Sequence, residues 1–431
     1  MTWASPGPVR SCDMRRLAVL SMHTSPLAQP GSGDGGGMNV YVRELCTALA
    51  RSGTACVVFT RADAPGLAPE VTVEPGFAVR HVVAGPEAGV PKAALPGLVD
   101  AFADAVEASL LADEAAGEAT PGAIHANYWL SGVAGHALKH RLDLPLVSTF
   151  HTLERVKAEA SPEDAEPGGE ARRAAAEAAV IGCSDALLAS CTVEADDLVA
   201  HYGADRARIE VVAPGVDGAF FAPGDRGQAR RALGLATEGR LLLFVGRIQP
   251  LKGADVAVRS LAALDERGLG GTRLLLVGGP SGPRGEEEVL ALRALVGCLG
   301  LEERVSFVPP QPHEALSSFY RAADCCVVPS RSESFGLVAL EAAACGIPVV
   351  ASEVGGLATL VEDGRTGFLV PDGTVGSFAD RLAAVLGDPS GAAAMGRAAA
   401  ARARTYTWPI AAGRLGRLYD ELTARTLVTC A

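Results

Sequence analysis

Two basic residues follow a strongly apolar segment in "FVGRIQPLKG" (244–253). A buried strand is predicted to end at Gly246, and Arg247 and Lys252 then flank a short loop before the next helix. Cations beside the carboxyl end of a strand and the N-terminus of a helix are suited to binding a diphosphate. An isolated arginine and lysine are also common as solvated surface charges, so this segment alone leaves both interpretations open.

Two acidic residues lie eight positions apart in "PSRSESFGLVALEAAACGIPVVAS" (329–352). Glu333 ends a serine-rich loop, and Glu341 is predicted about two turns into a helix that starts near Phe335 and Gly336. Carboxylates accept hydrogen bonds from sugar hydroxyls, and small residues at a helix start let amides approach a phosphate. A glycosidase also uses two acids, but the adjacent phosphate-binding elements disfavour it. A capping Glu333 with a surface Glu341 is the non-functional alternative.

A glycine-rich loop precedes a helical pattern in "SMHTSPLAQPGSGDGGGMNVYVRELCTALA" (21–50). Gly31, Gly33 and Gly36 formally satisfy G-x-G-x-x-G, which would suggest a dinucleotide-binding dehydrogenase. In that fingerprint the glycines follow the strand directly, whereas eight residues separate Met22 from Gly31 here. The loop still offers amides to an anion or a sugar. The chain has no G-x-x-x-x-G-K-[ST], which disfavours a P-loop ATPase.

Short apolar strands alternate with longer helical patterns along the whole chain, which predicts parallel sheets. Strands are predicted at 16–22, 55–60, 78–83, 145–150 and 208–214, and then at 240–246, 273–279, 305–309, 325–330 and 347–352. A helix from Met38 carries Val42, Leu45 and Leu49 on one face and stops at Gly53. Strands this apolar are covered on both faces, so we expect an α/β fold of two doubly wound, Rossmann-like sheets that face each other across a cleft.

The predicted organisation has four parts. Residues 1–15 form a disordered extension, 16–215 a first domain, 216–405 a second domain, and 406–431 a C-terminal helix that is a candidate for crossing back to the first domain. The boundary is placed in "APGVDGAFFAPGD" (213–225), where Pro, Gly and Asp cluster. In this architecture ligands bind at the carboxyl ends of the strands.

Composition narrows the class of partners. The net charge of −12 gives no basic footprint for nucleic acid or anionic lipid, so neither is expected as a partner. No segment approaches the roughly 20 apolar residues of a membrane helix. The ten cysteines are scattered, several within apolar segments, and we interpret them as buried free thiols of a cytoplasmic protein.

The spacing of the two acidic residues, E-x(7)-E, together with the upstream R-x(4)-K pair, resembles glycosyltransferase family 4, whose members have the GT-B fold. The resemblance implies a retaining enzyme and a nucleotide-diphosphate sugar as donor. It also implies that Arg247 and Lys252 neutralise the donor diphosphate, Glu341 holds the ribose hydroxyls and Glu333 touches the transferred sugar. Stabilising the charge that grows on the leaving diphosphate would be the main catalytic need. Because no carboxylate nucleophile is evident, we expect front-face departure assisted by the phosphate itself.

Further segments resemble the branch of this family that transfers N-acetylglucosamine from UDP-N-acetylglucosamine to 1D-myo-inositol 3-phosphate in mycothiol biosynthesis. They are "GPEAGVPKAALP" (85–96), "HANYWLSG" (125–132), "FHTLERVK" (150–157) and "GEARR" (169–173), and the resemblance extends from about residue 16 to residue 424. It implies an acceptor site of His23, Asp34, Gly35, Gly36, Gly37, Met38, Asn39, Lys92, Tyr128, Thr152 and Arg172. In that site Lys92 and Arg172 would hold the acceptor phosphate.

The same resemblance implies further donor contacts from Gln29, Pro30, Gly37, Gln311, Phe335, Gly336 and Leu337. His151 is a candidate catalytic residue, although it could equally be a satisfied buried imidazole. No cofactor is required for the chemistry. A structural magnesium ion is implied at backbone positions of Tyr320, Arg321, Ala323 and Ile347, although no acidic cluster in the sequence demands it.

Departures from the family pattern surround the acceptor residues. The loop at Lys92 and the segments "HANYW" and "STFHTL" differ from the usual family versions. A family 4 enzyme with another nucleotide sugar, UDP- or GDP-linked, and a small thiol or aminocyclitol acceptor is therefore the alternative. A nucleotide-sugar-binding protein without turnover is disfavoured because Arg247, Lys252, Glu333 and Glu341 are all present. A homodimer is a candidate assembly.

Overall fold

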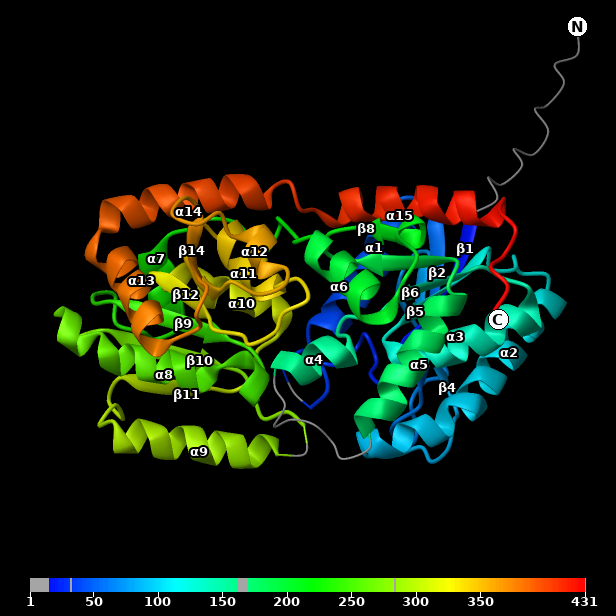
Figure 1. Cartoon of the computed structure of the whole chain (residues 1–431), viewed down its shortest axis with the longest axis horizontal. Coiled ribbons are helices and arrows are strands. Elements are labelled where there is room, and N and C mark those ends of the chain that lie inside the picture. Colours follow the sequence, from blue (N-terminus) through cyan, green and yellow to red (C-terminus); the bar gives the residue numbers. More distant parts are fainter. Residues whose placement is uncertain (1–14, 32, 161–168, 283, 431) are drawn as a thin grey trace, which may run out of the picture.

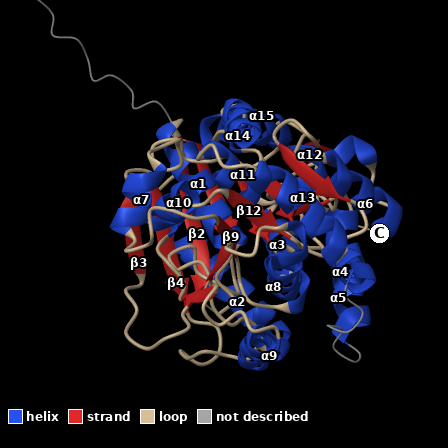
Figure 2. Cartoon of the chain, turned by 90° about the vertical axis from the view of Figure 1, so that its left-hand side faces the viewer, coloured by secondary structure: helices blue, strands red, loops and turns tan. Residues whose placement is uncertain are grey.

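Two sheets of mainly parallel strands, one in each half of the chain, organise the fold (Figure 1). The computed structural model describes residues 15–31, 33–160, 169–282 and 284–430. The predicted extension therefore lies outside the described residues, except for residue 15, which begins the first strand. Helices lie on both sides of the strands, as the side view in Figure 2 shows. The predicted α/β fold with two doubly wound domains is confirmed.

The N-terminal sheet has eight described strands in the order β3-β4-β2-β1-β5-β6-β7-β8. Its strands are β1 (Arg15–Leu20), β2 (Thr54–Arg61), β3 (Glu70–Glu74), β4 (Phe77–Val82), β5 (Ala123–Asn127), β6 (Leu146–Thr149), β7 (Ala186–Ala189) and β8 (Ile209–Val211). All neighbours are parallel except β3 and β4. The prediction missed β3, β5 and β7. The segments of β5 ("AIHAN") and β7 ("ALLA") are short and alanine-rich, and Ile124 is their only β-branched residue, so they carry a weaker strand signal than the other strands.

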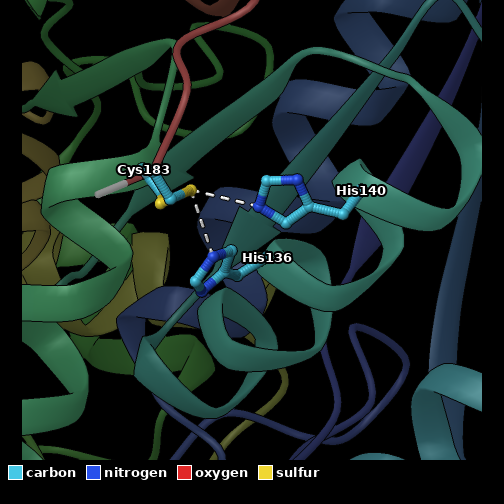
Figure 3. Close-up of side chains that lie close together, drawn as sticks. His136, His140 and Cys183 are labelled. Atoms are coloured by element: carbon cyan, nitrogen blue, oxygen red, sulfur yellow. Dashed lines mark hydrogen bonds between the residues drawn. A yellow bond between two sulfur atoms is a disulfide. The ribbon is translucent and has the colours of Figure 1, made fainter.

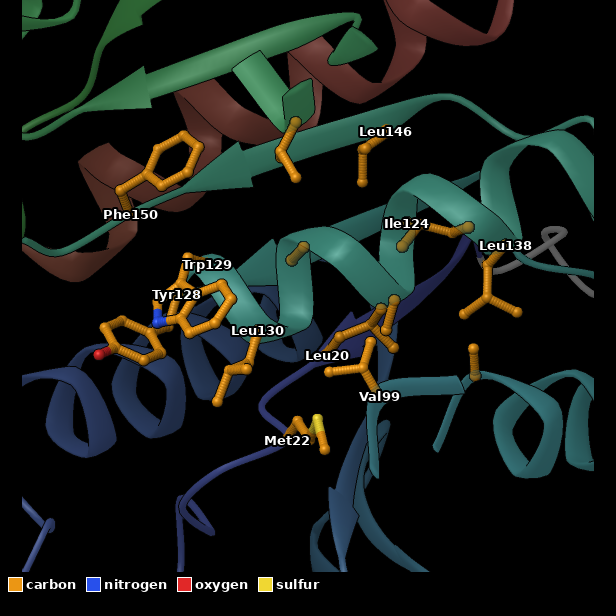
Figure 4. Packing of buried hydrophobic residues seen from close by; sticks show 14 of the residues in the cluster. Leu20, Met22, Val99, Ile124, Tyr128, Trp129, Leu130, Leu138, Leu146 and Phe150 are labelled. Carbon is orange, nitrogen blue, oxygen red and sulfur yellow. The ribbon is translucent and has the colours of Figure 1, made fainter. Parts of the chain in front are cut away.

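Helices cover both faces of this sheet. They are α1 (Gly37–Arg51), α2 (Val99–Ala115), α3 (Trp129–Leu142), α4 (Glu154–Ala160), α5 (Gly169–Cys183), α6 (Thr192–Tyr202) and the last helix of the chain, α15 (Trp408–Thr423). On one face Leu20, Ile124 and Leu146 of the strands pack against Leu130 and Leu138 of α3 (Figure 4). The other face is covered by α1 and α15. The three apolar residues predicted on one face of α1, Val42, Leu45 and Leu49, are all buried.

The C-terminal sheet has six described strands in the order β11-β10-β9-β12-β13-β14, all parallel. They are β9 (Leu241–Val245), β10 (Arg273–Val277), β11 (Val305–Val308), β12 (Cys325–Val328), β13 (Val349–Ser352) and β14 (Gly367–Val370). The helices are α7 (Arg226–Ala232), α8 (Ala254–Ala263), α9 (Gly285–Cys298), α10 (Leu316–Ala322), α11 (Leu337–Ala344), α12 (Leu357–Leu360), α13 (Val375–Gly387) and α14 (Pro389–Ala403). Two apolar clusters, one on each face, fill the space between sheet and helices.

The chain crosses between the domains twice, and the two crossings lie side by side. After α14 the chain returns to the N-terminal domain, where α15 packs against α1 (Figure 1). The Val216 amide donates to the Tyr406 carbonyl at 3.1 Å. A Cβ on Gly215 would lie 2.1 Å from the Trp408 amide nitrogen, so only glycine fits at this close approach. In the core, the Tyr419 hydroxyl of α15 lies 2.9 Å from Nδ1 of buried His125 on β5.

The prediction that all ten cysteines are free thiols is wrong for one pair. Cys183 at the end of α5 and Cys430 in the C-terminal tail form a disulfide with a Cα–Cα distance of 5.1 Å. The other cysteines of the described chain are free, and all except Cys298 are buried. The pair is separated by 247 residues in sequence. It forms because α15 carries the tail back to the first domain, which no local spacing signals. Among the described residues, no helix is both long and apolar enough to cross a membrane.

Candidate active site

A cleft of about 900 Å³ lies between the two domains, at the carboxyl ends of strands from both sheets. Each domain contributes one wall. The C-terminal wall contains Arg247, Lys252, Glu333 and Glu341, and the N-terminal wall contains the glycine loop, Lys92, Tyr128 and His151. The sequence motifs from the two halves of the chain are therefore brought to one site, as the position of ligand sites in open α/β sheets leads us to expect.

The two residues predicted to bind the diphosphate lie between the end of β9 and the start of α8. Lys252 ends a 3₁₀ turn just before α8, and its Nζ lies 2.6 Å from Oε2 of Glu333. Arg247 donates from Nη1 to the Ser281 hydroxyl at 3.1 Å. Burial lowers the pKa of Arg247, while the charges of Asp34 and Glu333 act to raise it. A partly desolvated guanidinium and a lysine on one wall form a strong site for an anion.

Glu341 is buried in α11 and already has two hydrogen-bond partners. Tyr320 donates its hydroxyl to Oε2 at 2.7 Å, and Nε2 of His313 lies 2.7 Å from Oε1. Burial acts to lower the pKa of His313, but the charge and hydrogen bond of Glu341 outweigh it and raise that pKa. Because α11 starts at Leu337, Glu341 lies about one turn into the helix; the predicted two turns are wrong. His313 also lines the cleft and was not predicted.

The glycine loop brings the backbone of the first domain close to the second. A Cβ on Gly36 would lie 3.2 Å from Nε of Arg247, so the absence of a side chain permits the approach. Asn39 is buried and structural, because its Oδ1 accepts from the Gly36 amide at 2.8 Å and its Nδ2 donates to Thr24. Gln29 donates from Nε2 to the Pro310 carbonyl of the second domain at 3.1 Å. The loop thus closes one end of the cleft.

Tyr128 is the centre of a cationic group on the N-terminal wall. Lys92 Nζ lies 5.1 Å from the centre of its ring, the Arg173 guanidinium 4.9 Å, and the His23 ring 4.3 Å. Asp34, at 4.0 Å from Lys92, is the acidic neighbour. Cations around an aromatic ring are stabilised by its quadrupole. We call Lys92 and Arg173 the Tyr128 cation group, and His23 packs against the same ring as an imidazole.

Arg173 lines the cleft next to the predicted Arg172 and was not predicted from the sequence. Its Nη2 donates to the Thr152 carbonyl at 2.8 Å, and ion pairs to Glu154 and Glu177 at 2.7 and 2.8 Å fix its orientation. Arg172 also lines the cleft but is exposed, and within the described part of the chain it has no hydrogen bond or ion pair. The paired "RR" in the sequence was the available signal.

His23 is partly buried in this wall, close to basic residues of both domains. Burial lowers its pKa well below the ordinary value, and the nearby charges of Lys92 and Arg247 lower it further. Its buried Nδ1 has no hydrogen-bond partner among the described residues. A buried polar atom without a partner is costly, so a ligand with a donor or acceptor at this point would remove the cost.

His151 has a strained backbone, with a φ of 61°, and lies opposite Tyr41 with ring centres 4.9 Å apart. Such outliers concentrate at functional sites, and Tyr128, with a φ of 75°, is another on the same wall. Nε2 of His151 lies 2.9 Å from Oδ1 of the Asn127 side-chain amide; this oxygen can only accept, so Nε2 carries the proton and Nδ1 remains an acceptor. Burial, assisted by His125, lowers the pKa of His151 to about 3. The imidazole is therefore neutral near pH 7.

The backbone positions implied for magnesium lie outside the cleft lining, at the end of α10 and before β13. The Tyr320 carbonyl already accepts from the Ala323 amide at 3.0 Å, and Arg321 donates from Nε to the Ala222 carbonyl at 2.8 Å. Ile347 contributes no charged group. This donor set fits Mg²⁺ poorly, because the ion prefers carboxylate oxygens and water in octahedral geometry. We therefore assign no role in the reaction to a metal ion at this position.

Most of the predicted site residues lie in one cavity. The cleft lining includes His23, Pro30, Asp34, Gly36, Gly37, Met38, Lys92, Tyr128, His151, Thr152, Arg172, Arg247, Lys252, Gln311, Glu333, Phe335, Gly336, Leu337 and Glu341. Gln29, Gly35 and Asn39 lie behind the lining and position the loop. Besides Arg173 and His313, the lining contains Tyr41 and Ser281, which were not predicted.

Comparison with known proteins identifies this architecture. The family model described as "Glycosyltransferase Family 4" matches residues 35–220, and the one described as "Glycosyl transferases group 1" matches residues 225–402. A relative from Actinosynnema mirum named D-inositol 3-phosphate glycosyltransferase is 49% identical, and the alignment covers 92% of this chain and 94% of the relative. The chain belongs to glycosyltransferase family 4.

Other members and solved structures agree with a family 4 glycosyltransferase. A protein of the same name from Kribbella flavida is 48% identical over 93% of this chain and 94% of its own length. Sucrose-phosphate synthase from Thermosynechococcus elongatus aligns with a TM-score of 0.86 and 32% identity, covering 96% of this chain and 100% of that chain. HepE of Anabaena, solved with UDP and glucose, aligns with a TM-score of 0.73 at 20% identity and shows the fold alone. The predicted GT-B fold and transferase activity are confirmed.

Proposed function

We propose that this family 4 glycosyltransferase moves N-acetylglucosamine from UDP-N-acetylglucosamine to 1D-myo-inositol 3-phosphate, with retention of the anomeric configuration. The observation that carries the proposal is a pair of separate cationic groups on opposite walls of one cleft. Arg247 and Lys252 occupy the donor wall, and the Tyr128 cation group occupies the other. Two cationic groups suit two phosphorylated substrates, a sugar diphosphate and a phosphorylated acceptor. The names of the relatives from A. mirum and K. flavida support the same acceptor.

The donor would lie along the C-terminal wall. Arg247 and Lys252 would bind the diphosphate, and Glu341, held by Tyr320 and His313, would accept from the ribose hydroxyls. Glu333 would contact the transferred sugar once the diphosphate competes with it for Lys252. His313 lines the cleft and is hydrogen-bonded to Glu341, so it would fix the orientation of the Glu341 carboxylate.

The transfer itself would break the bond between C1 of the sugar and the diphosphate oxygen and form a bond from C1 to an acceptor hydroxyl oxygen on the same face. The hydroxyl proton would pass to the departing phosphate oxygen, so no protein nucleophile is needed. Arg247 and Lys252 would stabilise the charge that builds up on the diphosphate, which is the larger part of the barrier. Neutral His151, with Nδ1 free to accept, would orient a sugar or acceptor hydroxyl rather than donate a charge.

The test is to identify the product and its anomeric form. The purified protein is incubated with 1D-myo-inositol 3-phosphate and each of UDP-N-acetylglucosamine, UDP-glucose and GDP-mannose, and the product is analysed by NMR. We expect an α-linked N-acetylglucosaminyl product from the first donor only. A β-linked product would contradict retention, and preference for another donor would contradict the assigned sugar. Donor hydrolysis without transfer to inositol phosphate would redirect the search to thiol or aminocyclitol acceptors.

A further inference from the structure

Four potential metal ligands meet away from the cleft, at the point where the C-terminal tail contacts the first domain. They are His136 and His140 of α3, Cys183 at the end of α5 and Cys430 of the tail. One ligand atom from each lies within 4.8 Å of the others. None of the four is among the cleft-lining residues of the described chain. This cluster, which we call the tail cluster, has no part in the proposed transfer.

The two histidines come from consecutive turns of one helix face. Side chains four residues apart in an α-helix point the same way, and these two rings have centres 5.1 Å apart. Nε2 of His140 lies 3.0 Å from the Cys430 sulfur, and Nε2 of His136 lies 3.3 Å from it. Figure 3 shows both imidazoles directed at the sulfur next to Cys183. A disulfide by itself has no need for two imidazoles pointing at it.

The positions of the ligand atoms are close enough together for a tetrahedral zinc site to form by small side-chain movements. With Zn–N distances of about 2.0–2.1 Å and Zn–S distances of about 2.3 Å, the ligand atoms of such a site lie about 3.3–3.8 Å apart. The two nitrogen-to-sulfur distances already fall at or near this range. Once the disulfide is reduced, the two sulfurs need only move apart to about 3.8 Å, which rotation of the cysteine side chains allows.

The backbone around the tail cluster is fixed by an independent polar network. Asp185 is buried; its Oδ2 accepts from Lys139 Nζ and from the Leu146 amide, both at 2.8 Å, and its Oδ1 accepts from the Val428 amide at 2.6 Å. Lys139, which lies between the two histidines in sequence, also donates to the Cys183 carbonyl at 2.7 Å. The buried ion pair between Lys139 and Asp185, with its hydrogen bonds, therefore fixes the relative positions of α3, the end of α5 and the tail. The tail cluster is preorganised before any metal binds.

We propose that, with Cys183 and Cys430 reduced, the tail cluster binds one Zn²⁺ through two imidazoles and two thiolates. Two thiolates neutralise the divalent charge, and the mixed nitrogen and sulfur set selects zinc over magnesium or calcium. Binding displaces one proton from each thiol. In the oxidised form the sulfurs are in a disulfide, so a dithiol or phosphine reductant must first supply two electrons. The zinc ion then links Cys430, in the tail beyond α15, to α3 and α5 of the first domain.

The test measures metal binding to the full-length protein after removal of any affinity tag. The protein is reduced with a phosphine, desalted anaerobically and titrated with Zn²⁺, and separately with Co²⁺, whose thiolate complexes absorb in the near ultraviolet and visible. We expect about one metal ion per chain and the visible bands of tetrahedral cobalt. The variants Cys430→Ser and His140→Ala should bind roughly 100-fold more weakly or worse. Cys298→Ser, which removes an exposed free thiol elsewhere, is the matched control and should bind like the wild type.

A thermal measurement adds a second readout. Zinc should raise the Tm of the reduced wild type and of Cys298→Ser, and chelation should reverse the rise, whereas Cys430→Ser should not respond. Reduced wild-type protein that binds no zinc would overturn the proposal, and so would zinc binding that persists unchanged in both ligand variants. Glycosyl transfer should be retained in Cys430→Ser, so failure of the zinc site and failure of the proposed function are distinguishable.

Discussion

Among single residues, Arg247 and Lys252 are the two that we propose stabilise the leaving diphosphate. Arg247 is held by Ser281 and lies beside the glycine loop, where Gly36 leaves room for it. Lys252 pairs with Glu333, so a bound diphosphate would replace one charge interaction within the protein. We therefore expect that the site does not have to be assembled when the donor binds.

Arg247→Ala should lower kcat for transfer about 10³-fold or more, because a group that stabilises transition-state charge is removed. Steady-state kinetics with saturating donor and acceptor measure the effect. Arg273→Ala, an arginine at the exposed start of β10, is the matched control and should keep wild-type turnover. A loss smaller than tenfold in Arg247→Ala would argue against diphosphate stabilisation by this residue.

Sequence spacing predicted that Arg247, Lys252, Glu333 and Glu341 lie together, because they belong to continuous motifs at strand ends; their donor role stays a prediction. The acceptor wall was harder, since its members come from the glycine loop, the loop at Lys92, β5 and α5. Arg172 was predicted and Arg173 was not, although both line the cleft, and the ion pair of Arg173 to Glu154 joins residues in different helices. His313 was missed because its role depends on Glu341, which is distant in sequence.

Among the helices and strands, the last helix, α15, completes the hydrophobic core of the first domain. α15 supplies one side of an apolar cluster that includes β1 and α1, and Tyr419 joins it to His125 of β5. The sequence identified this helix as a candidate for crossing back, but the apolar cluster in which it docks is made of residues from the first half of the chain. The Cys183–Cys430 pair was unpredictable for the same reason.

Tyr419→Phe should destabilise the protein by about 1–3 kcal/mol, because it leaves the buried Nδ1 of His125 without its partner. Urea unfolding followed by circular dichroism measures the change. Tyr406→Phe, whose hydroxyl has a single long contact of 3.4 Å to Arg402, is the conservative control and should change stability little. Equal stability of Tyr419→Phe and the wild type would mean that the hydrogen bond contributes nothing to docking α15.

At the scale of the whole molecule, two rigid sheets face one cleft and are joined by two adjacent crossings. Gly215 and Trp408 touch at these crossings, and the Gln29–Pro310 contact closes the other end of the cleft. This arrangement was predictable from the alternation of strands and helices. The detailed contact between the domains was not, because it depends on backbone approaches that only glycines permit.

The whole protein should lose stability in mild acid. Burial lowers the pKa of His125 to about 3, and burial together with His125 does the same for His151. An unfolded histidine has a pKa of about 6.5, so below that pH the unfolded state binds protons that the native state does not. Stability should therefore fall by about 2 kcal/mol for each of these histidines between pH 7 and pH 5, with the raised pKa of His313 acting in the opposite direction.

Urea unfolding at pH 7 and pH 5, at constant ionic strength, measures this loss. The variant His125→Gln, whose side chain does not titrate, should show a smaller difference between the two pH values. An unchanged or higher midpoint at pH 5 in the wild type would show that these imidazoles are protonated in the native state.

Specificity for the acceptor phosphate tests the proposed phosphate site at the Tyr128 cation group. kcat/KM is compared for 1D-myo-inositol 3-phosphate and myo-inositol, in the wild type and in Lys92→Ala. We expect the wild type to prefer the phosphorylated acceptor by about 10²-fold or more. Lys92→Ala should reduce that preference about 10- to 100-fold, the value of one hydrogen bond to a charged group. Equal use of both acceptors by the wild type, or an unchanged preference in Lys92→Ala, would contradict a phosphate site at the Tyr128 cation group.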